Sequence, residues 1–311
     1  MSVLNYLWVE KYRPAKLEDY VFTDDNQRNQ IYSWVKDGNI PHILLSGSAG
    51  VGKTTLAKVL FNELDIDNYD ILEINASRDN GVDFIRERIE GFVSTMPFGK
   101  FKVVLLDEAD YLSHNAQAVL RGLMETYAST SRFILTCNLP HKIIPPIHSR
   151  CQSFHIDKTD LTEFTARMAQ ILINENITFE LDILDNYVRA TYPDLRKCIN
   201  AVQLNSSEGS LLSTVGNGNK KSEDYKIEAI ALFKNGKFRD ARKMIASQIR
   251  PDEIDEMYRW FYDNLDLWSP TEEGQDQAIL IIKKAMVDHT LCADPEINLA
   301  AAMIELSQVN V

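Results

Sequence analysis

The sequence predicts an α/β domain, with a mostly parallel sheet and helices on both faces, followed by purely helical regions. In residues 1 to about 155, short apolar runs alternate with helix-like stretches; the runs are 43–45, 71–74, 103–106, 133–136 and a weaker one at 151–156. Such alternation favours parallel strands joined by crossover helices. From about residue 159, helical patterns follow one another without strand-like runs between them.

The helical regions divide into two groups. Residues 161–174, 180–191 and 194–204 form the first; Asp160 or Thr159 can cap its first helix, and Pro193 suits the first turn of its third. The second comprises 224–235, 237–248, 252–266, 273–288 and 294–309. Clusters of Gly, Ser and Asn at 206–210 and 216–222 indicate a linker, or alternatively a long surface loop. We therefore expect four parts: an α/β module (1–157), a small helical module (158–208), a linker (209–223) and a C-terminal helical domain (224–311).

Composition limits the kinds of partner. The formal net charge is −12, which argues against a protein that coats nucleic acid indiscriminately but leaves room for a local basic surface. The four cysteines are scattered, with no C-x-x-C spacing, so neither a zinc site nor a disulfide framework is indicated. No apolar run reaches the ~18 residues of a membrane span, and the first residues lack the pattern of a signal peptide. We expect an intracellular protein with no membrane partner.

The most informative motif is the segment Gly-Ser-Ala-Gly-Val-Gly-Lys-Thr at residues 47–54. It matches the phosphate-binding pattern G-x-x-x-x-G-K-[ST], between an expected strand at 43–45 and a helix-like stretch at 55–60. Its glycines let backbone N–H groups and a helix N-terminus face a polyphosphate. We expect Lys53 to reach the β and γ phosphates and the Thr54 hydroxyl to hold Mg²⁺.

Two further strand ends carry polar residues. Asp107 and Glu108 follow the run 103–106 and are expected to hold Mg²⁺ and to polarise an attacking water, respectively. A solvated acidic turn is the alternative, and the intact phosphate loop disfavours it. Asn138 follows the run 133–137; it can orient the water, although its residue type alone fits an ordinary turn better.

With these motifs in place, the chain resembles AAA+ ATPases of the sliding-clamp-loader type. It is similar to the small subunits of replication factor C and to the large subunit of T-even-type phage clamp loaders. The order and spacing match over residues 8 to about 205, and the N-terminal motif and the Ser-Arg-Cys triplet are the most specific. Besides the phosphate loop, the resembling segments are 8–14 (Trp-Val-Glu-Lys-Tyr-Arg-Pro), 74–77, 107–110, 136–138, 149–151 (Ser-Arg-Cys) and 193–197.

The resemblance implies a role for each matching residue of the nucleotide site. Arg150 would be an arginine finger that acts on ATP in the neighbouring subunit, Asn138 a first sensor, and Arg196 a second sensor carried by a helical lid. ATP with Mg²⁺ would be the cofactor; a surface position is the alternative for both arginines. The implied ATP-binding residues are Val9, Tyr12, Arg13 and Pro14 around the adenine, and Gly47, Ser48, Ala49, Gly50, Val51, Gly52, Lys53, Thr54 and Thr55 around the phosphates.

Partner contacts implied by the resemblance are less specific. Arg78 and Arg86 would contact DNA phosphates without reading sequence, although Glu87 and Glu90 interleave with them as on a solvated helix face. Met96 and Phe98 would grip the clamp, or else form a local core cap.

The family often has paired arginines where this chain has Arg121-Gly122, which leaves the role of Arg121 open. The alternative for Arg121 is an ion pair with Glu125, four residues later on one helix.

The implied function is that of an ATPase subunit of a DNA clamp loader. ATP binding would open the clamp and engage primer–template DNA, and hydrolysis would release the clamp on DNA. Other copies of the chain and at least one distinct subunit would complete a pentameric ring, with residues 224–311 as its collar. Another AAA+ DNA-remodelling ATPase of the recombination or branch-migration type, a P-loop kinase and a non-hydrolysing ring subunit are the alternatives.

Pro193 before Asp194 resembles the phage-type second sensor, since cellular small subunits usually carry Gly there. This favours a phage replication protein. The compartment would then be the host cytoplasm, whereas a cellular protein would reside in the nucleus or cytoplasm.

Overall fold

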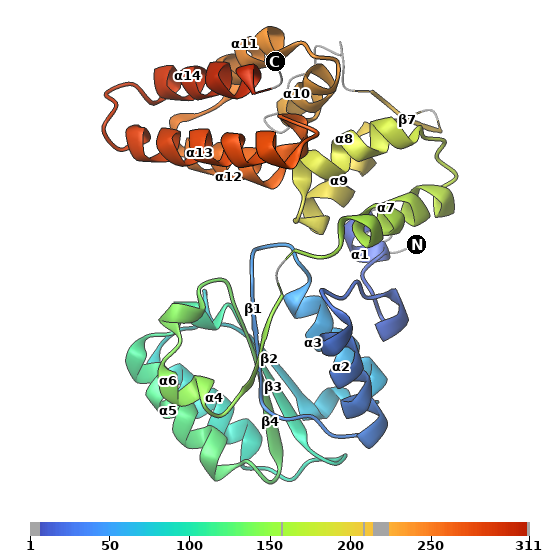
Figure 1. The fold of residues 1–311 in the computed structure, drawn as a ribbon. Coiled ribbons are helices and arrows are strands. Elements are labelled where there is room, and N and C mark those ends of the chain that lie inside the picture. Colours follow the sequence, from blue (N-terminus) through green and yellow to red (C-terminus); the bar gives the residue numbers. More distant parts are fainter. Residues whose placement is uncertain (1–6, 157, 208, 214–223, 310–311) are drawn as a thin grey trace. The chain divides into compact units, whose positions relative to one another are not determined.

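The computed structural model describes residues 7–156, 158–207, 209–213 and 224–309. The chain forms two compact units, which are described separately: Met1–Ile171 with Tyr192–Asn200, and Leu172–Thr191 with Ala201–Val311 (Figure 1). Residues 157 and 208 and most of the expected linker lie outside the described residues, so the four-part division remains a prediction. Within the described residues, no helix combines the length and the apolar character that crossing a membrane requires.

The first unit contains a five-stranded parallel sheet, which confirms the predicted α/β fold. The strand order is β2-β3-β4-β1-β5. The strands are β1 (Ile43–Ser46), β2 (Ile71–Asn75), β3 (Lys102–Asp107), β4 (Ser131–Cys137) and β5 (Gln152–His155). Every expected apolar run lies in or next to one of these strands.

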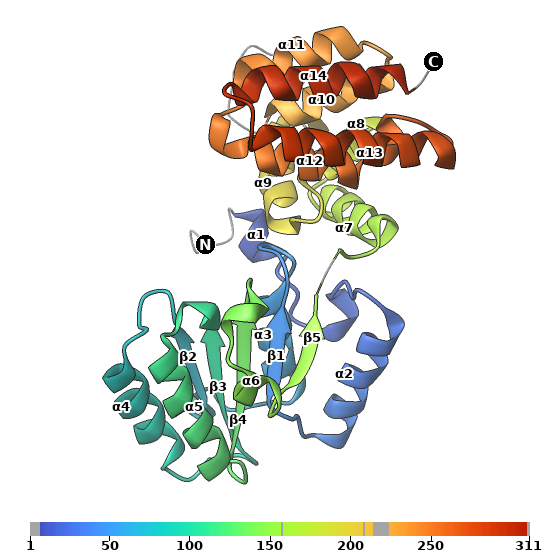
Figure 2. The same ribbon diagram turned by 60° about the vertical axis from the view of Figure 1, so that its left-hand side comes forward.

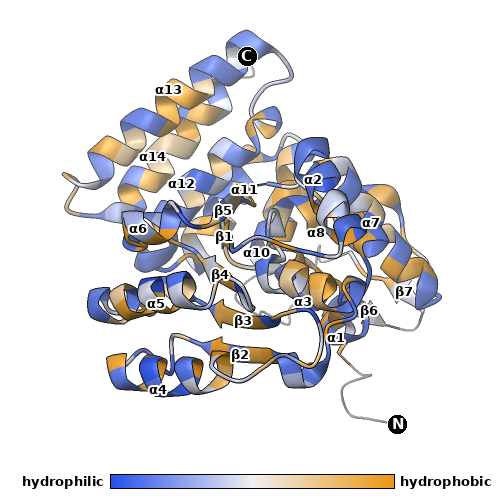
Figure 3. Cartoon of the chain, turned by 90° about the horizontal axis from the view of Figure 1, so that it is seen from below, coloured by the Kyte–Doolittle hydropathy of each residue, from blue (hydrophilic) through white to orange (hydrophobic). Residues whose placement is uncertain are grey.

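Helices cover both faces of this sheet (Figure 2). On one face, α4 and α5 pack over Val104, Leu106 and Phe133; on the other, α2 and α3 pack over Leu105 and Ile134. Successive residues of one strand therefore feed two separate cores, and Figure 3 shows apolar β2 and β3 beside helices of mixed colour. The helices are α1 (Trp8–Lys11), α2 (Asp25–Asp37), α3 (Lys53–Glu63), α4 (Val82–Val93), α5 (His114–Thr126) and α6 (Pro145–His148).

The strand register brings three loops together. Ser46 at the end of β1 lies opposite Cys137 at the end of β4, and Leu106 of β3 lies opposite Leu135. The strands are parallel, so their carboxyl ends share one edge of the sheet. The loops after β1, β3 and β4 carry the three motifs found in the sequence, and they meet at this edge.

Two helices that begin in the first unit follow the sheet. α7 (Leu161–Asn174) is capped by Asp160, as predicted, because its Oδ1 accepts hydrogen bonds from the N–H groups of Thr162 and Glu163 at 2.8 and 3.1 Å. The predicted helical position of Pro193 is wrong. α9 (Leu195–Asn205) begins two residues later, because the Asp194 carboxylate accepts from Lys197 N at 2.9 Å and caps the helix.

The second unit is helical around an aromatic cluster. Phe233, Trp260, Phe261 and Trp268 pack together, with ring centroids of Phe233 and Trp268 4.9 Å apart. These aromatics therefore belong to a core. The helices are α8 (Leu181–Thr191), α10 (Asp224–Lys234), α11 (Phe238–Gln248), α12 (Ile254–Asp263), α13 (Glu272–His289) and α14 (Pro295–Gln308).

Polar contacts join α8 to the rest of this unit. Asp185 of α8 forms ion pairs with Arg189, at 2.7 Å, and with Lys234 of α10, at 2.6 Å. Arg189 also pairs with Asp266 at 2.5 Å, and its carbonyl accepts from Trp260 Nε1 at 2.9 Å.

The segment 206–210, expected to be linker or loop, contributes to a short strand pair. β6 (Ser206–Ser207) and β7 (Ser210–Leu211) form a short antiparallel pair. Gly209 has φ +80°, a conformation that glycine adopts without strain, and its carbonyl accepts from Thr178 N at 2.8 Å. Strands of two residues are too short to produce a periodic pattern in the sequence.

Candidate nucleotide site

The phosphate loop connects β1 to α3 and depends on glycine at several positions. Gly47, Gly50 and Gly52 have φ of 146°, 74° and 95°, where other residues are strained. A Cβ on Gly47 would also lie 2.0 Å from the carbonyl oxygen of Ile156. The backbone conformation therefore requires glycine at these three positions of the motif, and the carbonyl of Ile156 leaves no room for a side chain at the first.

Lys53, the first residue of α3, is buried at the centre of the loop. Its Nζ donates hydrogen bonds to the carbonyl oxygens of Gly47 and Ser48 at 2.8 and 2.6 Å, and to Asn138 Oδ1 at 2.8 Å. Burial lowers the pKa of Lys53, and the charge of Asp107 opposes this shift. The structure thus brings Lys53 and Asn138 together. Phosphate oxygens carry negative charge and would therefore attract this ammonium more strongly than the neutral loop carbonyls do.

Thr54 and Asp107 also meet at this edge. Thr54 Oγ1 donates to Asp107 Oδ1 at 2.8 Å, and Thr136 Oγ1 donates to the same oxygen at 2.5 Å. A carboxylate and a hydroxyl oxygen side by side are hard oxygen donors of the kind that Mg²⁺ takes. The donor set fits the predicted metal. Thr136 lies in the resembling segment 136–138 but is not among the predicted site residues; otherwise its sequence signal is a polar residue near the end of an apolar strand.

Glu108 has an unusual backbone conformation. Its φ of 58° and ψ of 42° place a non-glycine residue in the left-handed region. The backbone N–H donates to Thr136 Oγ1 at 3.0 Å, which holds the residue in place. Left-handed residues of this kind cost roughly 1–3 kcal/mol and cluster at functional sites. The strain is consistent with the predicted catalytic role of Glu108.

Asp110 positions the segment that carries Asn138. Its side chain is 7% exposed, and Oδ2 accepts from the N–H groups of Asn138 and Leu139 at 3.3 and 3.2 Å. The second aspartate of the segment 107–110 therefore fixes the loop after β4. The sequence carries no residue-level signal for this contact, because Asp110 and Asn138 are 28 positions apart.

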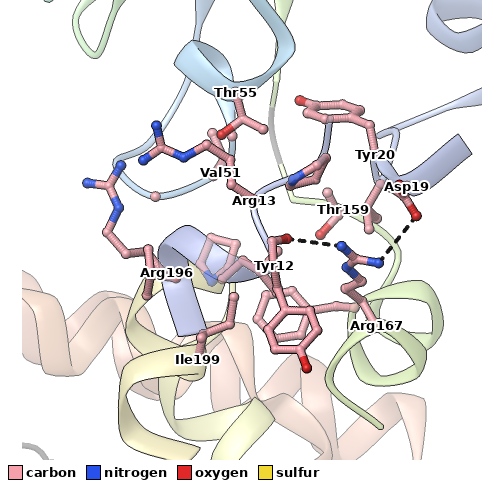
Figure 4. Close-up of a pocket in the computed structure, with 18 residues that line it drawn as sticks. Tyr12, Arg13, Asp19, Tyr20, Val51, Thr55, Thr159, Arg167, Arg196 and Ile199 are labelled. Carbon is pink, nitrogen blue, oxygen red and sulfur yellow. Dashed lines mark hydrogen bonds and ion pairs between the residues drawn. The ribbon is translucent and has the colours of Figure 1, made fainter. Parts of the chain in front are cut away.

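A pocket within the first unit lies beside the phosphate loop (Figure 4). The four residues predicted for adenine, Val9, Tyr12, Arg13 and Pro14, line it, as do loop residues Gly50, Val51, Gly52 and Thr55. One wall comes from α7 and the start of α9, including Arg196. The structure therefore places the expected adenine residues and part of the phosphate loop around one cavity.

Arg167 of α7, a residue that sequence reasoning does not single out, braces this pocket. Its Nη2 donates to the carbonyl oxygen of Tyr12 at 3.0 Å, and its Nη1 lies 3.7 Å from Asp19 Oδ1. The guanidinium thereby fixes the N-terminal segment against α7. In the sequence it is one arginine on an amphipathic helix, with nothing to mark it.

The start of α9 lies against the loop. A Cβ on Gly50 would be 1.9 Å from Asp194 Oδ1, so the carboxylate that caps α9 also contacts the phosphate loop. Burial raises the pKa of Asp194, while the nearby Lys197 and Arg196 charges oppose this. Arg196 is close enough for its charge to lower the pKa of Lys53, although burial is the larger cause of that shift.

Arg150 lies between α6 and β5, and it is not among the described residues that line the pocket of its own chain. Its Nη1 donates to the carbonyl oxygen of Pro146 at 2.7 Å, and its Nη2 contacts Glu125 Oε1. The predicted Arg121–Glu125 ion pair is present at 3.9 Å and uses the same carboxylate oxygen. Glu125 therefore joins both arginines.

The residues predicted for the clamp are strongly exposed. Met96 is 82% and Phe98 is 79% exposed, and the Phe98 ring lies 5.8 Å from the ring of Tyr69, centroid to centroid. Asp70, fully buried, accepts from the N–H groups of Phe98 and Gly99 at 3.0 and 2.7 Å, which fixes the segment. The alternative of a local core cap is therefore wrong for these side chains.

The residues predicted for DNA are exposed as well. Arg86 lies on the exposed side of α4 beside exposed Glu87, and Arg78 is exposed in the turn after β2. Glu90, one turn further along α4, is also part of this helix. The structure thus leaves both arginines accessible, with the acidic neighbours that the sequence predicts.

Comparisons with known proteins identify the family of the chain. Residues 43–157 match the family model "ATPase family associated with various cellular activities (AAA)". Replication factor C small subunits are similar over most of the chain. That of Methanocella arvoryzae is 36% identical over 93% of this chain and 89% of its own length, and that of Aeropyrum pernix is 40% identical over 81% and 74%.

Solved structures support the fold alone. The Holliday junction branch migration motor RuvB of Thermotoga maritima aligns with a TM-score of 0.53 at 16% identity, covering 62% of this chain and 64% of that chain. A lysine-to-arginine mutant of the same motor aligns with a TM-score of 0.55 at 14% identity, covering 76% and 79%. The sequence relatives share far more identity than these neighbours, and the chain belongs to the replication factor C small-subunit family of AAA ATPases.

Proposed function

We propose that this chain is the ATP-hydrolysing subunit of a DNA sliding-clamp loader. The observation that carries the proposal is the convergence of Lys53, Thr54, Asp107 and Asn138 at one edge of the sheet, next to the pocket. The family membership supports the same activity. ATP supplies the phosphoanhydride bond whose hydrolysis would change how the subunit holds its partners.

Each site residue has a defined task in this proposal. Lys53 exchanges its carbonyl partners for the β and γ phosphates, and Thr54 and Asp107 hold Mg²⁺. Glu108 accepts the proton of the attacking water, and Asn138 orients that water. Arg196 pairs with the γ-phosphate, so the position of α9 depends on which nucleotide is bound.

Arg150 acts on the ATP of a neighbouring subunit. It is absent from the described lining of its own pocket, and Pro146 and Glu125 hold its guanidinium at the surface. An arginine supplied in trans stabilises the charge of the phosphoryl transition state and is worth ~10³-fold or more. Hydrolysis would therefore depend on assembly.

The proposed partners follow from the family and the exposed residues. They are a sliding clamp, gripped by Met96 and Phe98; primer–template DNA, whose phosphates Arg78 and Arg86 contact; and other copies of this chain with at least one distinct subunit in a pentameric ring. Pro193 favours a phage origin, whereas the sequence relatives named above are archaeal. A phage protein would act in the host cytoplasm, and a cellular protein in the nucleus or cytoplasm.

A product assay separates this proposal from its alternatives. With ATP, Mg²⁺, clamp and primed DNA, the loader releases free phosphate, and the clamp raises the rate; a P-loop kinase would instead leave a phosphorylated acceptor. A branch-migration ATPase would respond to branched DNA and ignore the clamp. The likeness to RuvB is one of fold alone and does not favour that alternative.

A further inference from the structure

The hydroxyl of Tyr20 is a buried polar group without a partner. Tyr20 is 7% exposed, and its Oη makes no hydrogen bond within the described part of the chain. Other buried tyrosines of this protein are paired: Tyr187 donates to the carbonyl of Leu212 at 2.8 Å, and Tyr258 Oη lies 2.7 Å from Asn298 Nδ2. Buried polar groups are normally satisfied, so the exception at Tyr20 requires a physical reason.

Tyr20 lines the nucleotide pocket at its phosphate end. A Cβ built on Gly52 would lie 3.2 Å from Cε2 and 3.4 Å from Oη of Tyr20, so the phenol edge touches the last glycine of the loop. Thr55 of α3 lines the same pocket, and Figure 4 shows the Tyr20 hydroxyl on the side of the ring that faces Thr55. The ring itself is fixed by an edge-on contact with Phe22, whose centroid is 5.0 Å away.

The chemistry of this position favours an anionic acceptor. Burial raises the pKa of Tyr20 well above its usual range, so the hydroxyl keeps its proton and remains a donor. The neighbouring N–H groups at the start of α3 are also donors, and a helix N-terminus after a glycine-rich loop attracts phosphate. A phosphate oxygen bound at the loop would supply the acceptor that this hydroxyl lacks.

We propose that the Tyr20 hydroxyl donates a hydrogen bond to a phosphate oxygen of the bound nucleotide, at the end of the loop formed by Gly52 and Thr55. The inference deepens the proposed function and rests on it. Tyr20 is thus a binding residue that the phosphate-loop pattern does not include, because it comes from a segment that precedes the loop in the chain.

The test is Tyr20→Phe, which removes only the hydroxyl and keeps the ring contact with Phe22. Affinities for ADP, ATP and adenosine are measured by calorimetry with Mg²⁺, and the Tm is measured without nucleotide. We expect ADP and ATP to bind about 10-fold more weakly, because a hydrogen bond to a charged group is lost, while adenosine binding stays within about twofold. The Tm of the nucleotide-free variant should be equal or higher, because an unsatisfied buried group has been removed.

Tyr192→Phe is the matched thermal control. Tyr192 Oη donates to the carbonyl of Thr159 at 2.5 Å in the same unit, so its loss should lower the Tm. Unchanged ADP and ATP affinity in Tyr20→Phe overturns the inference, as does an equal loss for adenosine, which would place the contact away from the phosphates. A wild-type chain that binds neither ADP nor ATP overturns the proposed function together with the inference.

Discussion

Glu108 and Arg150 are the two residues on which the proposed chemistry depends most, and the fold holds each in a specific way. Glu108 follows β3 in a left-handed conformation, with its N–H on Thr136. Arg150 is held by the carbonyl of Pro146 and the carboxylate of Glu125. In the proposed function the first serves its own chain and the second serves a neighbour, so their variants should behave differently.

Replacing Glu108 with Gln keeps the size of the side chain and removes its basicity. We expect ATP affinity to stay within about twofold, while turnover of the assembled loader falls about 10²-fold or more, because general-base catalysis contributes on this scale. Calorimetric ATP binding and phosphate release measure the two quantities. Glu87→Gln, at an exposed position of α4, is the control. Normal turnover in Glu108→Gln would remove this residue from the mechanism.

Replacing Arg150 with Ala should leave ATP binding unchanged and reduce assembly-dependent turnover about 10³-fold, since the residue acts on the neighbouring site. Arg239→Ala, at an exposed position of α11, serves as control. Mixing Arg150→Ala chains with Lys53→Ala chains should restore part of the turnover, because some interfaces then pair an intact arginine with an intact lysine. Full turnover in Arg150→Ala alone would exclude the role in trans.

Among the elements of the fold, the segment 94–101 combines a backbone fixed by a buried residue with an exposed apolar side chain. Asp70 holds the backbone of Phe98 and Gly99 from within the core, whereas the Phe98 side chain is 79% exposed. A fixed backbone presents an apolar side chain at little further entropic cost on binding. Stability and partner binding should therefore separate at this segment.

Phe98→Ala should weaken binding of the clamp about 10- to 30-fold, since a central aromatic anchor contributes roughly 2 kcal/mol at an interface. The Tm and the basal ATPase activity should not change, because the removed side chain is exposed. Surface plasmon resonance against the clamp measures the affinity, and Leu181→Ala, 70% exposed on α8, is the control for loss of surface apolar area. Equal affinity of Phe98→Ala and wild type would place the clamp contact elsewhere.

Part of the fold and of the candidate site can be predicted from the sequence, and part cannot. The five strands and the long helices follow from periodicity, and the phosphate loop and Asp107 follow from motifs at strand ends. The role of Asn138 follows only from the family resemblance, because its residue type alone fits an ordinary turn. Sequence reasoning misses Thr136, Asp110, Arg167 and Tyr20, because each acts through a contact with a residue distant in the sequence. It misses the β6–β7 pair because two-residue strands carry no period, and it misplaces Pro193 because the Asp194 cap sets the start of α9.

At the scale of the whole molecule, one largely buried histidine links stability to pH. His42 Nδ1 accepts from Phe133 N at 3.1 Å, and burial, together with the Arg132 charge, lowers the pKa of His42 to about 4. In the unfolded chain the pKa is about 6.5. The unfolded state therefore binds more protons between these values, so the stabilising contribution is complete above about pH 6.5 and is lost as the pH falls towards 4.

His42→Gln should flatten this dependence, because the Gln carbonyl can accept from Phe133 N and does not titrate. Between about pH 7 and 4.5 the wild type should lose on the order of 2 kcal/mol more unfolding free energy than the variant, a value reduced from the full linkage because the imidazole keeps some solvent contact. Urea unfolding at several pH values measures this. His141→Gln, at an exposed position, should follow the wild type; a His42→Gln curve parallel to the wild type would contradict the assignment.

In the proposed function, ATP is hydrolysed between neighbouring subunits of a ring that holds a clamp. The most direct test is the steady-state ATPase rate of the assembled loader, measured with and without clamp and primed DNA, beside the isolated chain at equal concentration. We expect low turnover for the isolated chain and a large increase only when assembly, clamp and DNA are all present. An isolated chain that hydrolyses ATP as fast as the complete assembly would contradict the proposed function.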